Sequence, residues 1–395
     1  MIFKKDELKY LGLFYFNDFF KTLFAVIGAY WIIYFNQKFS FSEIAIGMAL
    51  MSIAIFLFEV PTGAIADVFG RKFSVILGGL LISLITLTIP FIDSTFSFWI
   101  TLFVWGAAGT FISGAANAWI VDYLKNVKKE SLIREYYKKY HSVSNFSFIF
   151  ASLFGGLIVK YYGMTPLWFV QSAGFFLGTL ILFKQKEYFK RRKTNIKAHL
   201  KHAYKNIIKG AKFSINHKVV FYLLMSSFFI VIGEEIASIS WQPLLVLNGF
   251  KLEHLGYLLS LGAALGIFIP YITQTVIKKL KHEKYYFSSL TIIMSALYSL
   301  FFYIISPLFA GFVFVIKHLK FVLEDSVFEP YFQKFVPSKI RATVGSFKSL
   351  ILSIGFLIGD LIVGLTTDKI GVQNSIVIAG IITLPAVFFF LKIKE

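Results

Sequence analysis

The sequence predicts an all-α membrane protein with twelve transmembrane helices in two pseudo-symmetric six-helix bundles. Three observations predict this fold: an apolar composition, long apolar runs, and basic residues that alternate between the connections. Hydrophobic residues make up 57% of the 395 residues and charged residues 15%, with a mean hydropathy of +0.72. A water-soluble fold could not bury that much apolar surface, so lipid is the expected solvent for most of the chain.

Twelve apolar runs are long enough to cross a bilayer. The hydrocarbon core is about 30 Å thick, and a helix crosses it in roughly 20 residues. The first run lacks a small-residue cleavage site, so we expect a retained span rather than a signal peptide. The runs cover residues 10–34, 44–66, 73–92, 97–121, 140–160, 165–184, 219–247, 252–277, 285–305, 308–333, 342–366 and 373–391.

Lysine and arginine alternate between the two sides of this layout. The N-terminus, the even-numbered connections and the C-terminus hold 32 of the 40 basic residues. The odd-numbered connections hold four, and the predicted spans hold the other four. Because basic residues are retained in cytoplasmic loops, we expect a multi-pass protein of the cell membrane with both termini in the cytoplasm.

A basic stretch divides the chain. Residues 184–218 contain twelve Lys and Arg and one acidic residue, Glu187. They separate an N-terminal six-helix bundle at 1–183 from a C-terminal one at 219–395, a layout typical of duplicated transporters. The net charge of +19 would suggest nucleic acid in a soluble protein. Here we expect the linker to lie as an amphipathic helix on anionic lipid headgroups.

Several function classes are excluded or left unsupported. The chain has no Cys, which excludes thiol chemistry and Cys-based zinc or iron–sulfur sites. The seven His show no zinc-hydrolase spacing, and the glycines form no phosphate-binding motif. We therefore expect no cofactor, no metal and no enzyme activity, and an energy source that is an ion gradient or the substrate's own gradient.

One short loop carries a specific motif. Between the second and third runs the sequence reads Gly63-Ala-Ile-Ala-Asp67-Val-Phe-Gly70-Arg71-Lys72. Gly63 permits close helix approach, Gly70 permits an unusual backbone conformation, and the two cations anchor the loop in the cytoplasm. The pattern G-x-x-x-D-x-x-G-R-K resembles the loop signature of the major facilitator superfamily. The preceding Glu59-Val60-Pro61-Thr62 looks like its drug-exporter-type branches.

The resemblance implies a cytoplasmic latch. In that superfamily the loop's Asp lies against the start of the eleventh helix, here residues 342–345, and the Arg pairs with an acid that ends the fourth helix, here Asp122. The pairing would hold the two halves together in the outward-open state. The alternative is that Asp67, Arg71 and Asp122 only cap helices and fix the topology.

Ionisable residues within the spans mark a candidate transport site, because each costs at least about 2.5–3.5 kcal/mol to insert. Helices one, four, seven and ten line the central cavity in the family that this chain resembles. In these spans the chain carries Asp18, Lys21, Asn117, Glu234, Glu235, Lys317, Lys320, Glu324 and Asp325. We expect a carboxylate to carry protons: Glu234 or Glu235 first, then Glu324, then Asp18.

The alternative interpretation of these charges is a lattice of structural ion pairs, such as Asp18 with Lys21 and Lys320 with Glu324. Asp360, in the eleventh span, has no assigned role.

The sequence favours a secondary active transporter that exports a small organic or amphiphilic molecule in exchange for protons. Two alternatives stay open: uptake or facilitated transport of an organic anion, held by Lys21, Lys317 and Lys320, and a lipid or lysolipid flippase on the same scaffold. The expected partners are the small-molecule substrate, protons and membrane lipids. We expect no nucleic acid, and a monomer by analogy with the family.

Overall fold

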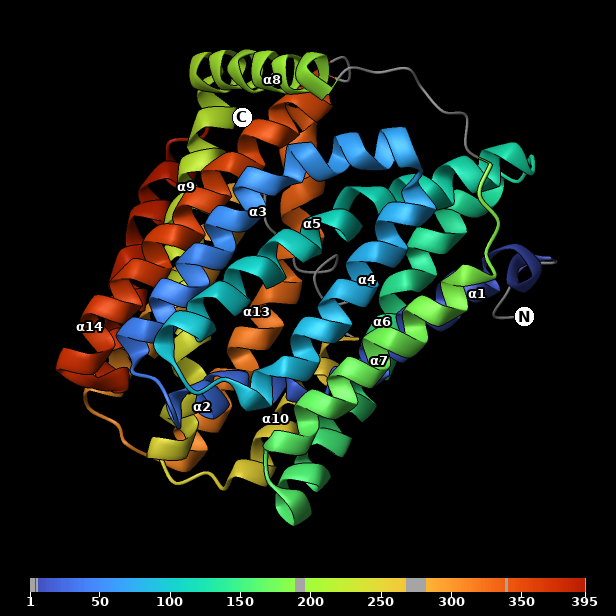
Figure 1. Ribbon diagram of the computed structural model, residues 1–395. Helices are drawn as coiled ribbons and strands as arrows, with labels where there is room; N and C mark the ends of the chain where they lie inside the picture. The colour runs from blue at the N-terminus through green and yellow to red at the C-terminus, as the bar shows by residue number, and fades with distance from the viewer. Residues whose placement is uncertain (1–3, 5, 189–195, 268–281, 338–339, 395) are drawn as a thin grey trace. The chain divides into compact units, whose positions relative to one another are not determined.

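The computed structural model describes residues 4, 6–188, 196–267, 282–337 and 340–394, and all regular secondary structure in these ranges is helical (Figure 1). The chain forms two compact units. Unit 1 comprises Met1–Trp31 and Ile53–Leu200, and unit 2 comprises Ile32–Ser52 and Lys201–Glu395. Each unit is therefore made of two separate stretches of the chain, and residues 32–52 belong with the second half of the sequence.

In unit 1, helix α4 packs against α5 and α7, and α1 packs against α6 and α7. The largest buried side chain of its core is Trp119 of α5. The elements are α1 (Glu7–Leu23), the 3₁₀ helix η1 (Val26–Ala29), the part of α3 (Phe41–Phe69) from Ile53 onward, α4 (Arg71–Thr88), η2 (Ile89–Phe91), α5 (Thr95–Asn126), α6 (Ser131–Tyr162) and α7 (Thr165–Phe183).

In unit 2, α14 packs against α9 and α12, and α10 packs against α13. Helix α14 consists of two helices that meet at Gly371, where φ is 82°. The other elements are α2 (Trp31–Asn36), the first part of α3, α9 (Lys218–Leu247), α10 (Leu252–Gly266), α12 (Glu283–Ser299), η3 (Leu300–Phe302), α13 (Pro307–Lys334) and α14 (Arg341–Leu391). The basic linker forms α8 (Ile196–Asn216), and its Phe213 packs against the core of unit 2.

The predicted all-α fold with about a dozen apolar helices is confirmed. Nine described helices are long and apolar enough to cross a membrane, and one of them, Thr343–Leu391, covers two predicted spans. Helix α13 is also long enough, but its charged residues lower its hydropathy. The predicted span 252–277 is described only as far as residue 267, and its remainder lies outside the described residues.

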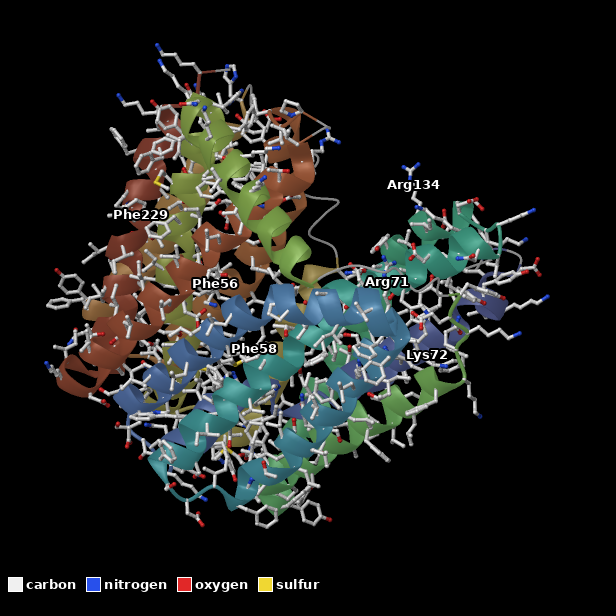
Figure 2. The ribbon with its side chains drawn as sticks, turned by 45° about the horizontal axis from the view of Figure 1, so that its top comes forward. Phe56, Phe58, Arg71, Lys72, Arg134 and Phe229 are labelled. Carbon is white, nitrogen blue, oxygen red and sulfur yellow. The ribbon has the colours of Figure 1, made fainter. Side chains whose placement is uncertain are left out.

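Exposed apolar side chains agree with a lipid environment. Phe56 and Phe58 of α3 are 54% and 37% exposed (Figure 2). Only 28% of the apolar window of α3 is buried within the protein. Water would penalise such a surface by about 25 cal/mol per Å², whereas acyl chains do not.

The first span is broken, and the prediction of one continuous run over 10–34 is wrong at this point. Helix α1 ends at Leu23, and the chain continues as η1 before α2 begins at Trp31. The irregular segment lies in close contact with α6, where a Cβ added at Gly155 would lie 2.6 Å from the carbonyl oxygen of Val26. The break therefore lets the irregular segment lie directly on α6.

Candidate functional site

Unit 1 encloses a cavity of about 290 Å³ that three of the predicted site residues line: Asp18, Lys21 and Asn117. Aromatic and apolar side chains from α1, α5 and α6 complete the wall, among them Phe14, Trp119, Tyr136 and Tyr140. The cavity thus combines one acid, one base and several rings, a composition typical of sites for small organic molecules.

Asp18 has defined partners in this cavity. The Tyr136 hydroxyl donates to its Oδ2 at 2.8 Å, and the Asn17 amide donates to its Oδ1 at 2.9 Å. Lys21, about one helical turn further along α1, attracts Asp18 electrostatically. The tyrosine comes from α6, so sequence spacing gave no signal for this contact.

In unit 2, Lys320 joins two of the predicted carboxylates. Its Nζ donates to Glu234 Oε1 at 3.0 Å and lies 2.8 Å from Glu324 Oε2. Lys317 Nζ lies 3.5 Å from Glu234 Oε2. Lys320 is only 4% exposed, so its charge is neutralised by protein groups rather than by water. Glu234 and Glu324 therefore belong to an ion-pair network, which is the alternative interpretation of these charges.

Glu235 has a different partner, the carboxyl group of Asp360 on α14. The two acidic groups lie close enough to interact electrostatically, and Ser52 lies near Asp360. A Cβ added at Gly359 would lie 2.7 Å from Glu235 Cβ, so α9 and α14 are in close contact here. Asp360 is 1% exposed.

The structure thus assigns a neighbour to Asp360, which sequence reasoning left without a role. A lone acid in an apolar run carries no sign of its partner. The side chain of Asp325 lies outside the described residues.

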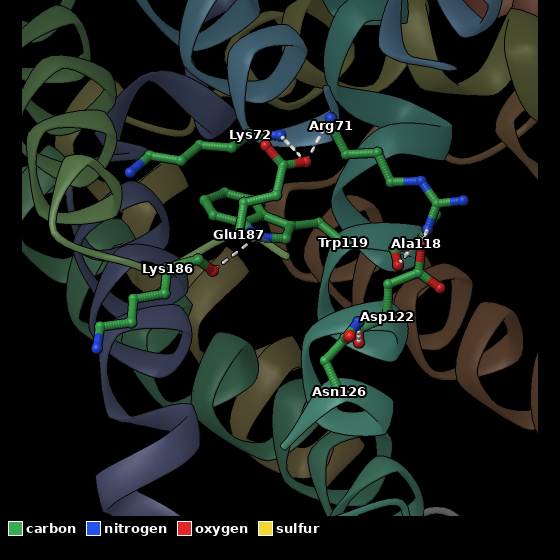
Figure 3. Close-up of polar contacts among 8 residues, drawn as sticks. All are labelled: Arg71, Lys72, Ala118, Trp119, Asp122, Asn126, Lys186 and Glu187. Carbon is green, nitrogen blue, oxygen red and sulfur yellow. Dashed lines mark hydrogen bonds and ion pairs between the residues drawn. The ribbon is translucent and has the colours of Figure 1, made fainter. Parts of the chain in front are cut away.

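The predicted latch loop brings Arg71 and Asp122 together. The Arg71 guanidinium forms an ion pair with Asp122 and donates to the carbonyl oxygen of Ala118 at 2.6 Å (Figure 3). Gly70 has a φ of 107°, a backbone conformation that residues other than glycine rarely adopt. The expectation of close helix packing at Gly63 is wrong, since a Cβ placed there meets no described atom within 4 Å.

Asp67 is half-buried on the last turns of α3. Its contact with the start of the eleventh span stays a prediction.

A residue that sequence reasoning did not select completes this loop. Glu187 Oε1 accepts the backbone N–H groups of Arg71 at 2.7 Å and of Lys72 at 3.0 Å (Figure 3). These are the first amides of α4, where the helix dipole favours an anion. The available signal was that Glu187 is the one acid among twelve cations in residues 184–218.

Two further hydrogen bonds hold the segment that carries Glu187. The Lys72 ammonium donates to the carbonyl oxygens of Phe183 at 2.7 Å and Gln185 at 2.8 Å. The Trp119 indole N–H donates to the carbonyl oxygen of Lys186 at 3.2 Å (Figure 3). The chain that leaves α7 is therefore fixed to α4 and α5.

Apolar helices that surround buried charges and a cavity define the class of an integral membrane transporter. The chain belongs to the Major Facilitator Superfamily, whose sequence pattern matches residues 11–323. It is 26% identical over 379 residues to YxaM of Bacillus subtilis (strain 168), an uncharacterized MFS-type transporter, with 92% of each chain covered.

Solved structures with 13–15% sequence identity share the fold. The nucleoside transporter NupG has a TM-score of 0.72 and 14% identity, covering 97% of this chain and 99% of that chain. The POT family transporter PepTSo gives 0.74 and 13%, with 98% and 97% covered. A bacterial homolog of the human lysosomal transporter Spinster, inward-facing and occupied, gives 0.72 and 15%, with 98% and 97% covered.

Proposed function

We propose that this protein is a secondary active transporter of the drug-exporter type, which exports a small organic or amphiphilic molecule in exchange for protons by alternating access. It would lie in the cell membrane with both termini in the cytoplasm. The observation that carries the proposal is the unit 1 cavity, where Asp18 lies among aromatic side chains. Membership of the superfamily supports the transport cycle.

The cavity lining favours a substrate with an apolar body and a cationic group. A buried carboxylate attracts an ammonium group, and rings such as Phe14 and Trp119 offer faces to its apolar part and its charge. The hydrogen bond from the Tyr136 hydroxyl holds the Asp18 carboxylate in place in the cavity lining. Asp18 is therefore the proposed substrate anchor.

Proton coupling is assigned to Glu235 with Asp360. Glu234 and Glu324 share the buried cation Lys320, so both carboxylates are already engaged in ion pairs. Glu235 instead lies beside a second acidic residue, Asp360, where α9 and α14 are in close contact at Gly359, and we assign the transported proton to this pair of carboxyl groups. Loss and uptake of that proton would change the charge at the centre of unit 2 during the cycle.

The organic-anion alternative has less support from the same contacts. Of the three cations that it needs, Lys317 and Lys320 face the carboxylates of Glu234 and Glu324. Two positive and two negative charges leave the network close to neutral, so Lys21 alone would attract an anion. This alternative and the lysolipid alternative become outcomes of the experiment below.

The experiment is transport by the purified protein in liposomes with an imposed pH gradient. Three panels are offered: cationic amphiphiles, organic anions, and lysolipids. We expect gradient-driven movement of a cationic amphiphile together with counter-movement of protons, read from a pH-sensitive dye. Movement of an anion or a lysolipid alone, or transport that ignores the pH gradient, would contradict the proposal.

Glu235→Gln tests the coupling residue. The glutamine amide can donate a hydrogen bond to Asp360 and so imitates the protonated state. We expect substrate binding to remain and substrate-driven proton flux to disappear. Glu253→Gln, at the first turn of α10 and outside the buried network, is the matched control and should retain the flux.

A further inference from the structure

One short segment early in the chain packs with the part that begins 149 residues after it. Residues 32–52 run from the end of the first predicted span into the second, yet they form a compact unit with Lys201–Glu395. Helix α3 contributes its residues 41–52 to this unit and has its remaining residues in unit 1. The unit boundary at Trp31 and Ile32 coincides with the break in the first span between η1 and α2. We call residues 32–52 the bridging segment.

A carboxylate of α14 holds the start of α3. Asp368 Oδ1 accepts the Phe41 N–H at 3.0 Å, and Oδ2 accepts the Ser42 N–H at 2.8 Å. The Ser42 hydroxyl lies 2.6 Å from Asp368 Oδ2 and 2.7 Å from the carbonyl oxygen of Gly364, and donates its single hydrogen to one of them at a time. These amides are the first of a 29-residue helix, where the dipole favours an anion.

Two other contacts extend this attachment. A Cβ added at Gly364 would lie 2.6 Å from Ala45 Cβ, so the glycine lets α14 touch α3. At the other end of the bridging segment, the Ile32 N–H donates to the fully buried Gln242 side chain of α9 at 3.1 Å. The segment is thus attached at both ends to elements of the second half of the sequence.

The attachment at Asp368 is built so that it can be released. A local capping box already serves α3, because Ser40 N–H donates to Glu43 Oε2 at 2.9 Å and Glu43 N–H donates to Ser40 Oγ at 3.2 Å. Removal of Asp368 would uncover only the Phe41 and Ser42 amides. Ser42 and Asp368 lie at an exposed position, where water can take over these hydrogen bonds. Helix α3 therefore survives either state.

We propose that Asp368 and the bridging segment form a clamp on the outer side of the membrane, closed in this structure, which must open for the transporter to release its cargo outward. The inference rests on the proposed alternating-access function and on the orientation expected from the basic residues. Opening transfers residues 32–52 from the helices of the second half to those of the first. The backbone must therefore change conformation at the two unit boundaries, between η1 and α2 and within α3 near Ser52.

The test measures a distance across the clamp, without substrate and without a pH gradient. The chain has no Cys, so spin labels can be placed only at Gln37→Cys and Lys369→Cys, two exposed positions beside the clamp. We expect a short distance to dominate in the parent protein. Asp368→Ala should shift the equilibrium toward a longer distance about tenfold, the effect of losing a charge-assisted contact. Asp368→Asn should give a smaller shift.

Glu43→Gln is the matched control, since it removes a carboxylate from the same helix end but leaves Asp368 in place. It should leave the distance distribution unchanged. Identical distributions in the parent protein and in Asp368→Ala would overturn the clamp. Because this readout needs no transport, it fails independently of the proposed function.

A second measurement covers the case in which Asp368 variants do not fold. A short bis-methanethiosulfonate cross-linker that joins Gln37→Cys to Lys369→Cys, with Asp368 and Ser42 intact, should abolish transport and spare substrate binding. Cleavage of the reagent should restore transport. Full transport by the cross-linked protein would show that the contact stays closed throughout the cycle, and the clamp would be rejected.

Discussion

Helices α3 and α4 begin in the same way, each with its first two amides held by a carboxylate from far along the chain. Glu187 serves α4 from 116 residues away, and Asp368 serves α3 from 327 residues away. The surroundings differ. Both partners of the Glu187 contact lie within unit 1, and α4 lies there entirely, whereas α3 is divided between the units. The same chemistry can therefore be a fixed support in one place and a releasable contact in the other.

The largest expected effect is the loss of stability in Gly70→Ala. With its control, this variant separates backbone strain at residue 70 from the contribution of the Glu187 contact. Gly70→Ala forces a side chain into φ 107° and places its Cβ 2.8 Å from Glu187 Oε2. We expect a loss of about 3 kcal/mol in the free energy of unfolding, from strain and loss of the cap. Gly371→Ala, at φ 82° with open space around it, is the control and should lose about 2 kcal/mol from strain alone. Thermal unfolding in detergent measures both, and equal losses would mean that Glu187 contributes nothing.

The next effect compares the two carboxylates directly. Glu187→Ala should lower the free energy of unfolding by about 1 kcal/mol and leave the distance between labels at residues 37 and 369 unchanged. Asp368→Ala should move that distance, as described above. A shift of this distance in Glu187→Ala would mean that the Glu187 contact also responds to the conformational state. The distinction between a fixed Glu187 contact and a releasable Asp368 contact would then be wrong.

A smaller effect concerns the rate of transport. If the latch interpretation is right, Asp67→Asn should slow transport several-fold and leave substrate affinity nearly intact, since the latch acts on one state of the cycle and not on the binding cavity. Rates and binding measured on the same preparation check this. A large loss of affinity at a normal rate would place Asp67 in the binding site instead.

The smallest expected effect is the change in the free energy of unfolding when only the charge of Glu187 is removed. Glu187→Gln keeps an oxygen that can accept from the Arg71 and Lys72 amides and removes only the attraction to the helix end. We expect about 0.5 kcal/mol in the free energy of unfolding, weakened by salt. Unfolding curves at low and high salt provide the measurement. A loss as large as that of Glu187→Ala would show that charge is essential to the contact.

Local signals in the sequence were sufficient for the helices. Apolar runs of membrane-spanning length and the alternation of basic residues predicted the all-α fold, because lipid imposes both. The break after Leu23 could not be predicted in this way. No Pro interrupts that run, and the broken segment contacts Gly155, which lies more than a hundred residues further along the chain.

The candidate sites show the same contrast between local sequence signals and contacts made by distant residues. Arg71 and Asp122 were matched through the resemblance of a loop motif, and Asp18 and Lys21 were selected because charge is costly in a span. The partners that define their environment, Tyr136 for Asp18 and Lys320 for Glu234, come from other helices. Asp368 carried no signal at all, although Ser40 and Glu43 show the capping box that marks the start of the helix it holds.

The turn at Gly371 has a mechanical consequence. Helix α14 reverses there within a single residue, without a loop that could absorb strain. The last two spans therefore form a stiff hairpin, with Asp368 three residues before its tip. At the far end of this hairpin, the Lys284 ammonium donates to the carbonyl oxygen of the fully buried Ile393 at 2.8 Å. Movement of Asp368 would therefore be transmitted along the second helix of this hairpin to the anchored residue Ile393.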